Sequence, residues 1–428
     1  MHKPPRRFVF GCLVFFACLP WWACSSSQQQ VTFSAFVRGA SKAKRRLAYP
    51  ALFGPHSHTG AQTEILSLLW TGSPDPDSRF VWNRWEIQTE EHAAPAISQD
   101  GQQLYVGGSN QRLSCMATRT GKHCWTRTLQ GRLAAPPYTH KEVVFVGTTS
   151  GMIYAIHRKT GKTKWKYQAE GEILSEMAYV EGDKEISPTL FATTGNDQLY
   201  ALHGENGKLL WRHKHESSTE TTLSVRGQSP PTVHKDKVYT GFSDGTLGAF
   251  QAGDGSVVWQ KSLRQQERFM DIDAPVVIRG AYLYAVSYNT GLHALRLQDG
   301  QKLWTYAIQG AGPPTFHEDK LYLSNSEGRV VCLYALSGNK IWEQRYKKAG
   351  AFSSIIATPT YLFLSGNRNG LYVLRRDAGH LVQALRLSRG ISASPVVFGQ
   401  RLFVFANSGF VFGFSMGLER NIRFSTEE

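Results

Sequence analysis

The sequence predicts an all-β protein, an eight-bladed β-propeller of four-stranded antiparallel blades. A tryptophan-centred motif recurs at intervals of 38 to 48 residues. Within each interval, short runs with strand character are separated by Gly, Asn and Asp turns, which is typical of propeller blades. The composition agrees, because 41% hydrophobic and 12% aromatic residues are too many for a disordered chain.

The repeat is defined by a Gly four residues before a Trp. Six copies have both residues: Gly121/Trp125, Gly161/Trp165, Gly207/Trp211, Gly255/Trp259, Gly300/Trp304 and Gly338/Trp342. A seventh copy, Gly379/Gln383, has lost the Trp. Four prolines each lie 29 residues before the Trp of their own copy, namely Pro136, Pro230, Pro275 and Pro313. This constant register excludes coincidence.

One copy shows the strands of a blade. Residues 231–234, 237–241, 246–250 and 257–261 are short apolar or alternating runs, and Ser243-Asp244-Gly245 separates the second from the third. Gly, Asn and Asp supply the positive φ that tight hairpins require. A unit of about 40 residues with four antiparallel strands is a propeller blade.

Eight such units account for residues 78–418, and 419–428 form a C-terminal tail. The units start near Ala94, Ala135, Glu172, Ser229, Ala274, Gly312, Ser353 and Ser394. The last unit has three clear strands and ends near Met416. We expect an N-terminal strand within Arg79–Thr89, which contains Trp85, to complete blade eight and to remove an exposed edge. The alternative is that Arg420–Phe424 supplies this strand.

The N-terminus predicts export. Residues 1–23 form a signal peptide, because Lys3, Arg6 and Arg7 precede an apolar run, Phe8–Leu19, that is too short to span a bilayer. The following Cys24 and its polar flank resemble a bacterial lipoprotein box, although Trp21 and Trp22 depart from its pattern. The resemblance implies acylation of Cys24 and the periplasmic face of the outer membrane. Ordinary signal cleavage nearby is the alternative.

Residues 24–77 lack a sustained periodicity and are interpreted as a flexible basic tether. Arg38–Arg46 carries five basic residues and no acid, so a weaker reading is contact with anionic lipid headgroups. The net charge of +15 suggests nucleic acid or an anionic membrane. Export removes cytoplasmic nucleic acid as a natural partner, and no nucleic-acid partner is predicted.

Two further patterns resemble known families. The form Thr160-Gly161-Lys162-x-x-Trp165 resembles PQQ-like propeller repeats, which implies a Trp that packs between neighbouring blades. Residues 223–231 and 270–275 resemble two segments of the BamB family, the lipoproteins of the outer-membrane β-barrel assembly machinery. Val225 replaces the family's Leu, and Ala274-Pro275 stands where the family often has Thr.

The BamB resemblance implies docking to a periplasmic domain of BamA through Leu223, Val225, Arg226, Asp271 and Asp273. Independently of that resemblance, both segments link the outer strand of one blade to the inner strand of the next. Such connections lie on one face of a propeller, so these five residues are expected on adjacent blades. Apolar and Arg side chains are frequent interface anchors. The alternative is a structural Arg–Asp ion pair that braces the two loops.

The rival function is an exported PQQ-dependent quinoprotein dehydrogenase or a PQQ-binding propeller. The family resemblance associates the enzyme with a calcium site, a catalytic Asp and often a vicinal cysteine pair. The sequence has no Cys-Cys and no acidic cluster at ligand spacing. The pairs His56/His58 and His213/His215 are read as surface histidines, since two ligands are weak evidence for a metal. We therefore predict a non-enzymatic scaffold with no cofactor, metal or small-molecule substrate.

Three cysteines remain outside the signal and the lipoprotein box. If the hairpin pairs Ala117 with Lys122, Cys115 faces Cys124 across two outer strands of blade one. A disulfide is permitted in an oxidising compartment, and two free thiols are the alternative. Cys332 lies in an apolar strand and is expected to be an inert core thiol.

Overall fold

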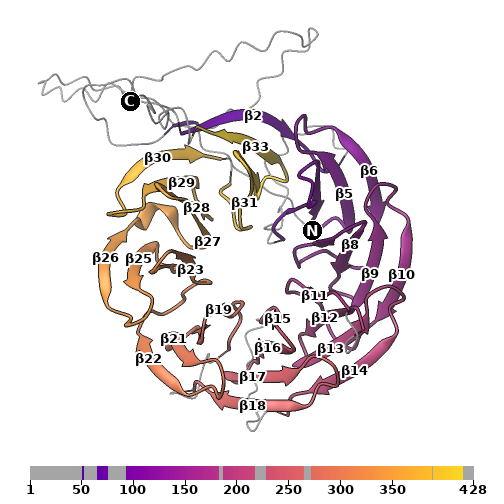
Figure 1. Ribbon diagram of the computed structural model, residues 1–428. Coiled ribbons are helices and arrows are strands. Elements are labelled where there is room, and N and C mark those ends of the chain that lie inside the picture. The colour runs from indigo at the N-terminus through magenta and orange to yellow at the C-terminus, as the bar shows by residue number, and fades with distance from the viewer. Residues whose placement is uncertain are drawn as a thin grey trace, which may run out of the picture. The chain divides into compact units, whose positions relative to one another are not determined.

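The eight predicted blades are present as eight antiparallel sheets arranged in a ring (Figure 1). The computed structural model describes residues 51–52, 65–75, 93–182, 187–216, 228–264, 271–387 and 389–417. Each sheet has four strands, and the seventh gains a fifth, β1 (Ala51–Leu52), on its outer edge.

Within each blade the strands run in order from the centre of the ring to its rim. The innermost strands are β3 (Ala96–Ile97), β7 (Tyr138–His140), β11 (Ala178–Val180), β15 (Thr232–His234), β19 (Val277–Arg279), β23 (Thr315–His317), β27 (Phe352–Ala357) and β31 (Val396–Phe398). The second strands are β4 (Gln103–Gly107), β8 (Val143–Gly147), β12 (Thr189–Thr194), β16 (Lys237–Gly241), β20 (Tyr282–Ser287), β24 (Lys320–Ser324), β28 (Tyr361–Gly366) and β32 (Arg401–Phe405).

The third strands are β5 (Arg112–Ala117), β9 (Met152–His157), β13 (Gln198–His203), β17 (Thr246–Gln251), β21 (Gly291–Arg296), β25 (Arg329–Tyr334), β29 (Gly370–Arg375) and β33 (Val411–Met416). The outer strands are β6 (His123–Thr128), β10 (Thr163–Gln168), β14 (Leu209–Lys214), β18 (Val257–Ser262), β22 (Lys302–Tyr306), β26 (Lys340–Arg345), β30 (Leu381–Arg386) and β2 (Leu66–Gly72). One 3-10 turn, η1 (Lys347–Ala349), precedes β27.

The antiparallel order fixes the two faces of the ring. Hairpins between first and second strands, and between third and fourth strands, lie on one face, here called the hairpin face. Turns between second and third strands share the opposite face with the connections from one blade to the next. This opposite face is called the loop face, and both segments predicted to dock a partner belong to its connections.

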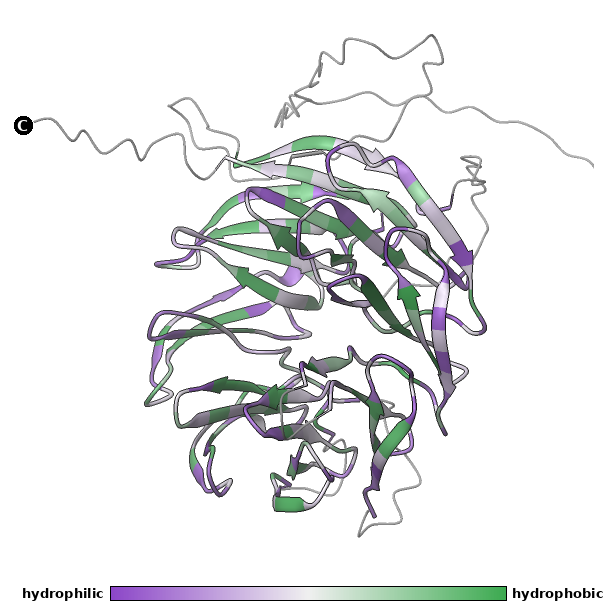
Figure 2. Cartoon of the chain, turned by 45° about the vertical axis from the view of Figure 1, so that its right-hand side comes forward, coloured by the Kyte–Doolittle hydropathy of each residue, from purple (hydrophilic) through white to green (hydrophobic). Residues whose placement is uncertain are grey.

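The core lies between adjacent blades and is formed mainly by their second and third strands. These strands are almost fully buried, as β12 and β13 illustrate, and they form the apolar interior seen in Figure 2. Between blades two and three, for example, Phe145 and Ile153 belong to one buried cluster with Leu190 and Tyr200. Each blade therefore buries its apolar faces only against its neighbours.

The repeated Gly and Trp make their contact between blades. Each Trp packs against the glycine of the next blade, where a Cβ atom would lie 2.5–2.8 Å from the indole ring. These glycines also have φ between +67° and +75°, a region that residues with a Cβ rarely adopt. The structure thus confirms that the tryptophans pack between neighbouring blades.

The strand that closes blade eight differs from the predicted one. An N-terminal strand does close the ring, but it is β2 (Leu66–Gly72), which pairs with β33 from Leu66↔Met416 to Gly72↔Val411. Trp70 takes the place of the repeated Trp, since it packs on Gly121 and donates to the Thr118 carbonyl at 2.8 Å. The propeller therefore begins before residue 78. Both Arg79–Thr89 and Arg420–Phe424 lie outside the described residues.

The predicted pairing of Cys115 with Cys124 is shifted by one residue. Ala117 does pair with Lys122, but a β-bulge follows, so Cys115 lies opposite Trp125 and Cys124 is the extra residue. The same bulge precedes the repeated Trp position in each of the eight blades. Both thiols are free in the structure, with Cys115 buried and Cys124 exposed, and Cys332 is buried as expected.

Candidate docking site on the loop face

Two of the five predicted docking residues lie in the described part of the chain. Asp271 and Asp273 belong to the connection between β18 and β19. Leu223, Val225 and Arg226 lie outside the described residues, as do Cys24 and the pair His56/His58. The connection that carries the first three is described only up to Glu216 and again from Gln228.

Ile272 fixes the backbone that carries the two carboxylates. Its side chain is buried and packs against Gly241, where a Cβ atom would lie 2.4 Å from it. Its N–H donates to the Phe242 carbonyl at 3.3 Å, so the connection is held on blade four before it enters blade five. A larger residue at position 241 would displace Ile272 and with it both aspartates.

The two carboxylates have different surroundings. Asp271 is only 3% exposed and its Oδ2 has no hydrogen-bond partner within the described ranges, whereas Asp273 is exposed on the loop face. Burial raises the pKa of Asp271. Desolvation by the surrounding loops and the nearby charge of Asp271 together raise the pKa of Asp273 to about 6. Such a pair favours a cationic partner, because an ammonium or guanidinium group would offset both the desolvation and the mutual repulsion.

The end of β14 is anchored immediately before the undescribed segment. His215 stacks on Phe242 with ring centroids 4.2 Å apart. Its Nε2 lies 2.9 Å from Asp244 Oδ2, and both side chains are over nine-tenths buried. Burial alone would raise the pKa of Asp244, but hydrogen bonds from His215 and Thr246 hold it below its ordinary value.

The other end of that segment is anchored to the preceding and following blades. Gln228 accepts from the Leu174 amide at 3.0 Å and donates to the Glu172 carbonyl at 2.8 Å. The Ser229 hydroxyl then donates to the Ala274 carbonyl at 3.0 Å. The segment that carries Leu223, Val225 and Arg226 therefore begins and ends at fixed points, and its second end is bonded to the connection of Asp271 and Asp273.

The sequence did not indicate these anchoring contacts, and the contacts of His215 correct one prediction. The sequence predicts surface histidines at positions 213 and 215, but the His213 ring centroid lies 4.6 Å from that of Phe250 and the His215 side chain is buried on Phe242. His213 lies on β14 and His215 directly follows its end, and both rings pack against blade four. Phe242 and Asp244 in the next repeat are the partners that could have indicated this arrangement.

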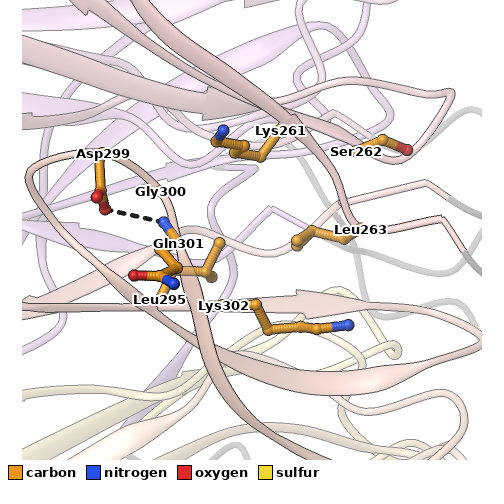
Figure 3. A pocket seen from close by; sticks show the side chains of 8 residues that line it. All are labelled: Lys261, Ser262, Leu263, Leu295, Asp299, Gly300, Gln301 and Lys302. Carbon is orange, nitrogen blue, oxygen red and sulfur yellow. Dashed lines mark hydrogen bonds between the residues drawn. The ribbon is translucent and has the colours of Figure 1, made fainter.

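A groove lies between the outer strands of blades four and five (Figure 3). It has a volume of about 520 Å³ and is lined by the ends of β18 and β21 and by the turn before β22. The residues are Lys261, Ser262, Leu263, Leu295, Asp299, Gly300, Gln301 and Lys302. The carboxylate of Asp299 is already bonded to the Gln301 amide and to Arg296, and we assign no ligand to this groove.

The described ranges contain neither a candidate metal site nor a candidate membrane-spanning helix. No three His, Cys, Asp or Glu side chains there are grouped as a metal site requires. In the same ranges, no helix has the length and hydropathy needed to cross a membrane.

Comparison with known proteins assigns the family. The family described as "Outer membrane protein assembly factor BamB" matches residues 69–180 and 109–344. The chain belongs to the BamB family. A Xanthomonas campestris member is 30% identical over 341 residues, which cover 75% of this chain and 81% of the relative. A Yersinia pestis member is 26% identical over 327 residues, covering 74% and 70%.

Solved structures agree on the fold. BamB from Moraxella catarrhalis superposes with a TM-score of 0.68 and 18% identity, covering 82% of this chain and 100% of the other. A quinohemoprotein alcohol dehydrogenase from Comamonas testosteroni gives a TM-score of 0.65 and 13% identity, covering 82% and 77%. At such identities the likeness concerns the propeller alone.

Proposed function

We propose that this BamB family member is a non-enzymatic periplasmic scaffold lipoprotein that docks to a periplasmic domain of a BamA-like outer-membrane assembly protein. Its curated relatives carry the description of outer membrane protein assembly factors. The docking surface is the loop face of blades four and five, formed by Leu223, Val225, Arg226, Asp271 and Asp273. Acylation at Cys24 attaches the chain to the periplasmic face of the outer membrane.

The observation that carries the docking proposal is the carboxylate pair. Asp271 keeps a buried oxygen without a hydrogen-bond partner among the described residues, and Asp273 is exposed two residues later. A buried carboxylate without a partner is costly, so a protein retains it where a cation completes the site. Either Arg226 from the neighbouring connection or a basic side chain of the bound protein supplies that cation.

The test measures the affinity of the full chain for the periplasmic part of the BamA-like protein of the same envelope. We expect Arg226→Glu, and separately Asp271→Asn with Asp273→Asn, to weaken binding by about 30-fold or more, because removing one partner of a desolvated charge pair costs about 2–5 kcal/mol. Asp254→Asn with Asp299→Asn is the matched control, since both aspartates lie in turns of the hairpin face and the charge changes equally.

Unfolding midpoints of all variants show whether the ring is intact. Wild-type affinity in both the Arg226 variant and the Asp271/Asp273 variant would refute the assignment. An equal loss in the control variant would instead indicate a general charge effect.

A further inference from the structure

The loop face carries a second charged surface, on the side away from the acidic docking region. It consists of Lys347 and Lys348 in η1, Arg368 in the turn between β28 and β29, and Arg389 between β30 and β31. All four side chains are exposed. None of them has an ion-pair partner within the described ranges, where the nearby Glu327 is already bonded to Arg345 at 2.7 Å. These four residues are called the basic patch.

The loops of the basic patch are locked together. Asn369 donates to the Lys348 carbonyl at 2.6 Å, and the Arg368 amide donates to the Ala349 carbonyl at 3.2 Å. Arg389 has φ +64°, and its carbonyl accepts from Asn407 at 3.1 Å. The four charges are therefore held on one surface by backbone contacts across blades six to eight, without depending on their own side chains.

The loop face is electrically divided. The described parts of the connections and turns of blades three to five contribute eight acidic residues, Glu170, Glu172, Glu176, Asp197, Glu216, Asp244, Asp271 and Asp273. The basic patch occupies the loops of blades six to eight. A single anionic partner could not cover the whole face without meeting like charge, so the two regions suit different partners.

The position at which the N-terminal segment reaches the propeller indicates the partner of the basic patch. β1 pairs with β30 in the register Ala51↔Arg386 and Leu52↔Leu385. Arg386 is the last residue of β30, at the end of the strand that lies on the loop face, so Ala51 lies at that face as well. Arg386 is three residues before Arg389. The chain preceding Ala51 thus reaches the ring next to the basic patch.

That preceding chain is the segment predicted to hold the protein at a membrane. Between Cys24 and Ala51 it spans at most about 100 Å when fully extended, and its Arg38–Arg46 stretch is itself basic. The anchored chain therefore joins the ring on the same face as the basic patch and beside the same blades. Four exposed charges spread over three loops also fit a planar anionic surface better than one carboxylate.

We propose that the basic patch binds anionic phospholipid headgroups of the membrane to which the chain is anchored. It orients the ring so that the loop face of blades six to eight meets the bilayer, while the acidic region of blades three to five remains available to a protein. Each basic residue near an anionic surface contributes about fivefold to partitioning, and the contribution falls as salt screens it.

The test uses the full chain with Cys24→Ser, so that no acyl group is attached. Its partitioning is compared between phosphatidylcholine vesicles and vesicles of phosphatidylcholine with phosphatidylglycerol. The ratio of the two coefficients removes any contribution from apolar insertion. We expect Lys347→Gln, Lys348→Gln, Arg368→Gln and Arg389→Asn together to lower this ratio at least tenfold, because Asn tolerates the positive φ at 389.

The matched control removes the same charge elsewhere, by Lys122→Gln, Lys162→Gln, Lys164→Gln and Lys166→Gln in the turns and outer strands of blades one and two. It should change the ratio less than threefold. The variant Lys347→Arg, Lys348→Arg, Arg368→Lys and Arg389→Lys should retain wild-type binding. If the neutral fourfold variant does not fold, Lys347→Gln with Lys348→Gln alone should lower the ratio at least threefold.

Two outcomes would overturn the proposal. One is an equal reduction in the patch and control variants, which would assign binding to net charge. The other is unchanged vesicle binding in the patch variant. If that variant also loses affinity for the BamA-like protein, the partner of the basic patch is an acidic protein segment. Retained affinity for that protein together with lost vesicle binding supports the basic patch independently of the docking proposal.

Discussion

Replacing Gln383 by Leu tests how the ring is closed. In the other blades the outer-strand Trp packs on a third-to-fourth-strand hairpin of the next blade. Blade eight has no such hairpin, because its outer strand β2 comes from the N-terminal part of the chain. Gln383 instead binds the backbone of β2, accepting from the Leu66 amide at 3.0 Å and donating to the Leu66 carbonyl at 3.3 Å.

Gln383→Leu removes both bonds and leaves a buried N–H and a buried C=O unpaired. Each unpaired group costs about 1–3 kcal/mol, so we expect the free energy of unfolding to fall by about 2–4 kcal/mol, with some compensation from the apolar side chain. Urea unfolding measures this loss, and hydrogen exchange should show reduced protection of the Leu66 amide. Gln260→Leu, on the exposed side of β18, is the control and should change stability by less than about 0.5 kcal/mol. A Gln383→Leu variant as stable as the control would refute this account of closure.

Three further predictions follow from individual contacts. Gly255→Ala should lower the free energy of unfolding by about 3 kcal/mol, because it adds strain at φ +75° and a clash with Trp211 of the preceding blade. The control Gly280→Ala, with φ +57° and open space around it, should cost about 1 kcal/mol. Equal losses in the two variants would contradict the role of Gly255 in packing against Trp211. Asp273→Asn should be more stable than the wild type at pH 7.5 and lose this advantage between pH 6 and pH 4. The reason is that the pKa of Asp273 is about 6 in the folded state and lower in the unfolded state, so its ionised form destabilises the fold and its protonated form does not. A difference in urea midpoints between Asp273→Asn and the wild type that does not vary with pH would refute this prediction. In the native protein a thiol reagent should label Cys124 but not Cys115, because Cys115 is buried and that burial raises its pKa. Peptide mass mapping identifies the labelled cysteine. If both cysteines react only after reduction, they form a disulfide and the prediction is wrong.

The corrections share one physical origin. The sequence repeat marks the strands within a blade, but it does not contain the contacts between blades. The Gly and Trp of one repeat belong to different contacts, since each Trp meets the next glycine. The bulge that offsets Cys115 from Cys124 lies within a blade, directly before the Trp that packs on the next blade, and no local pattern distinguishes it from a regular hairpin.

The candidate site shows the same division. The resemblance to family segments located Asp271 and Asp273, but the burial of one and exposure of the other depend on how Ile272 packs into blade four. His215 was misread because its partners, Phe242 and Asp244, lie in the following repeat.

The sequence alone determined the repeat, and therefore the all-β class, the number of blades and their strands, because turn residues and alternating apolar runs act over a few neighbouring residues. Only the tertiary structure decided that β2 closes blade eight and that Gln383 binds it. Only the folded ring, too, gathers Lys347, Lys348, Arg368 and Arg389 on one side of the loop face. The strand pairing that closes the ring and the basic patch both join residues far apart in the chain. These residues come together only when the ring has formed, so no local pattern in the sequence predicts their contacts.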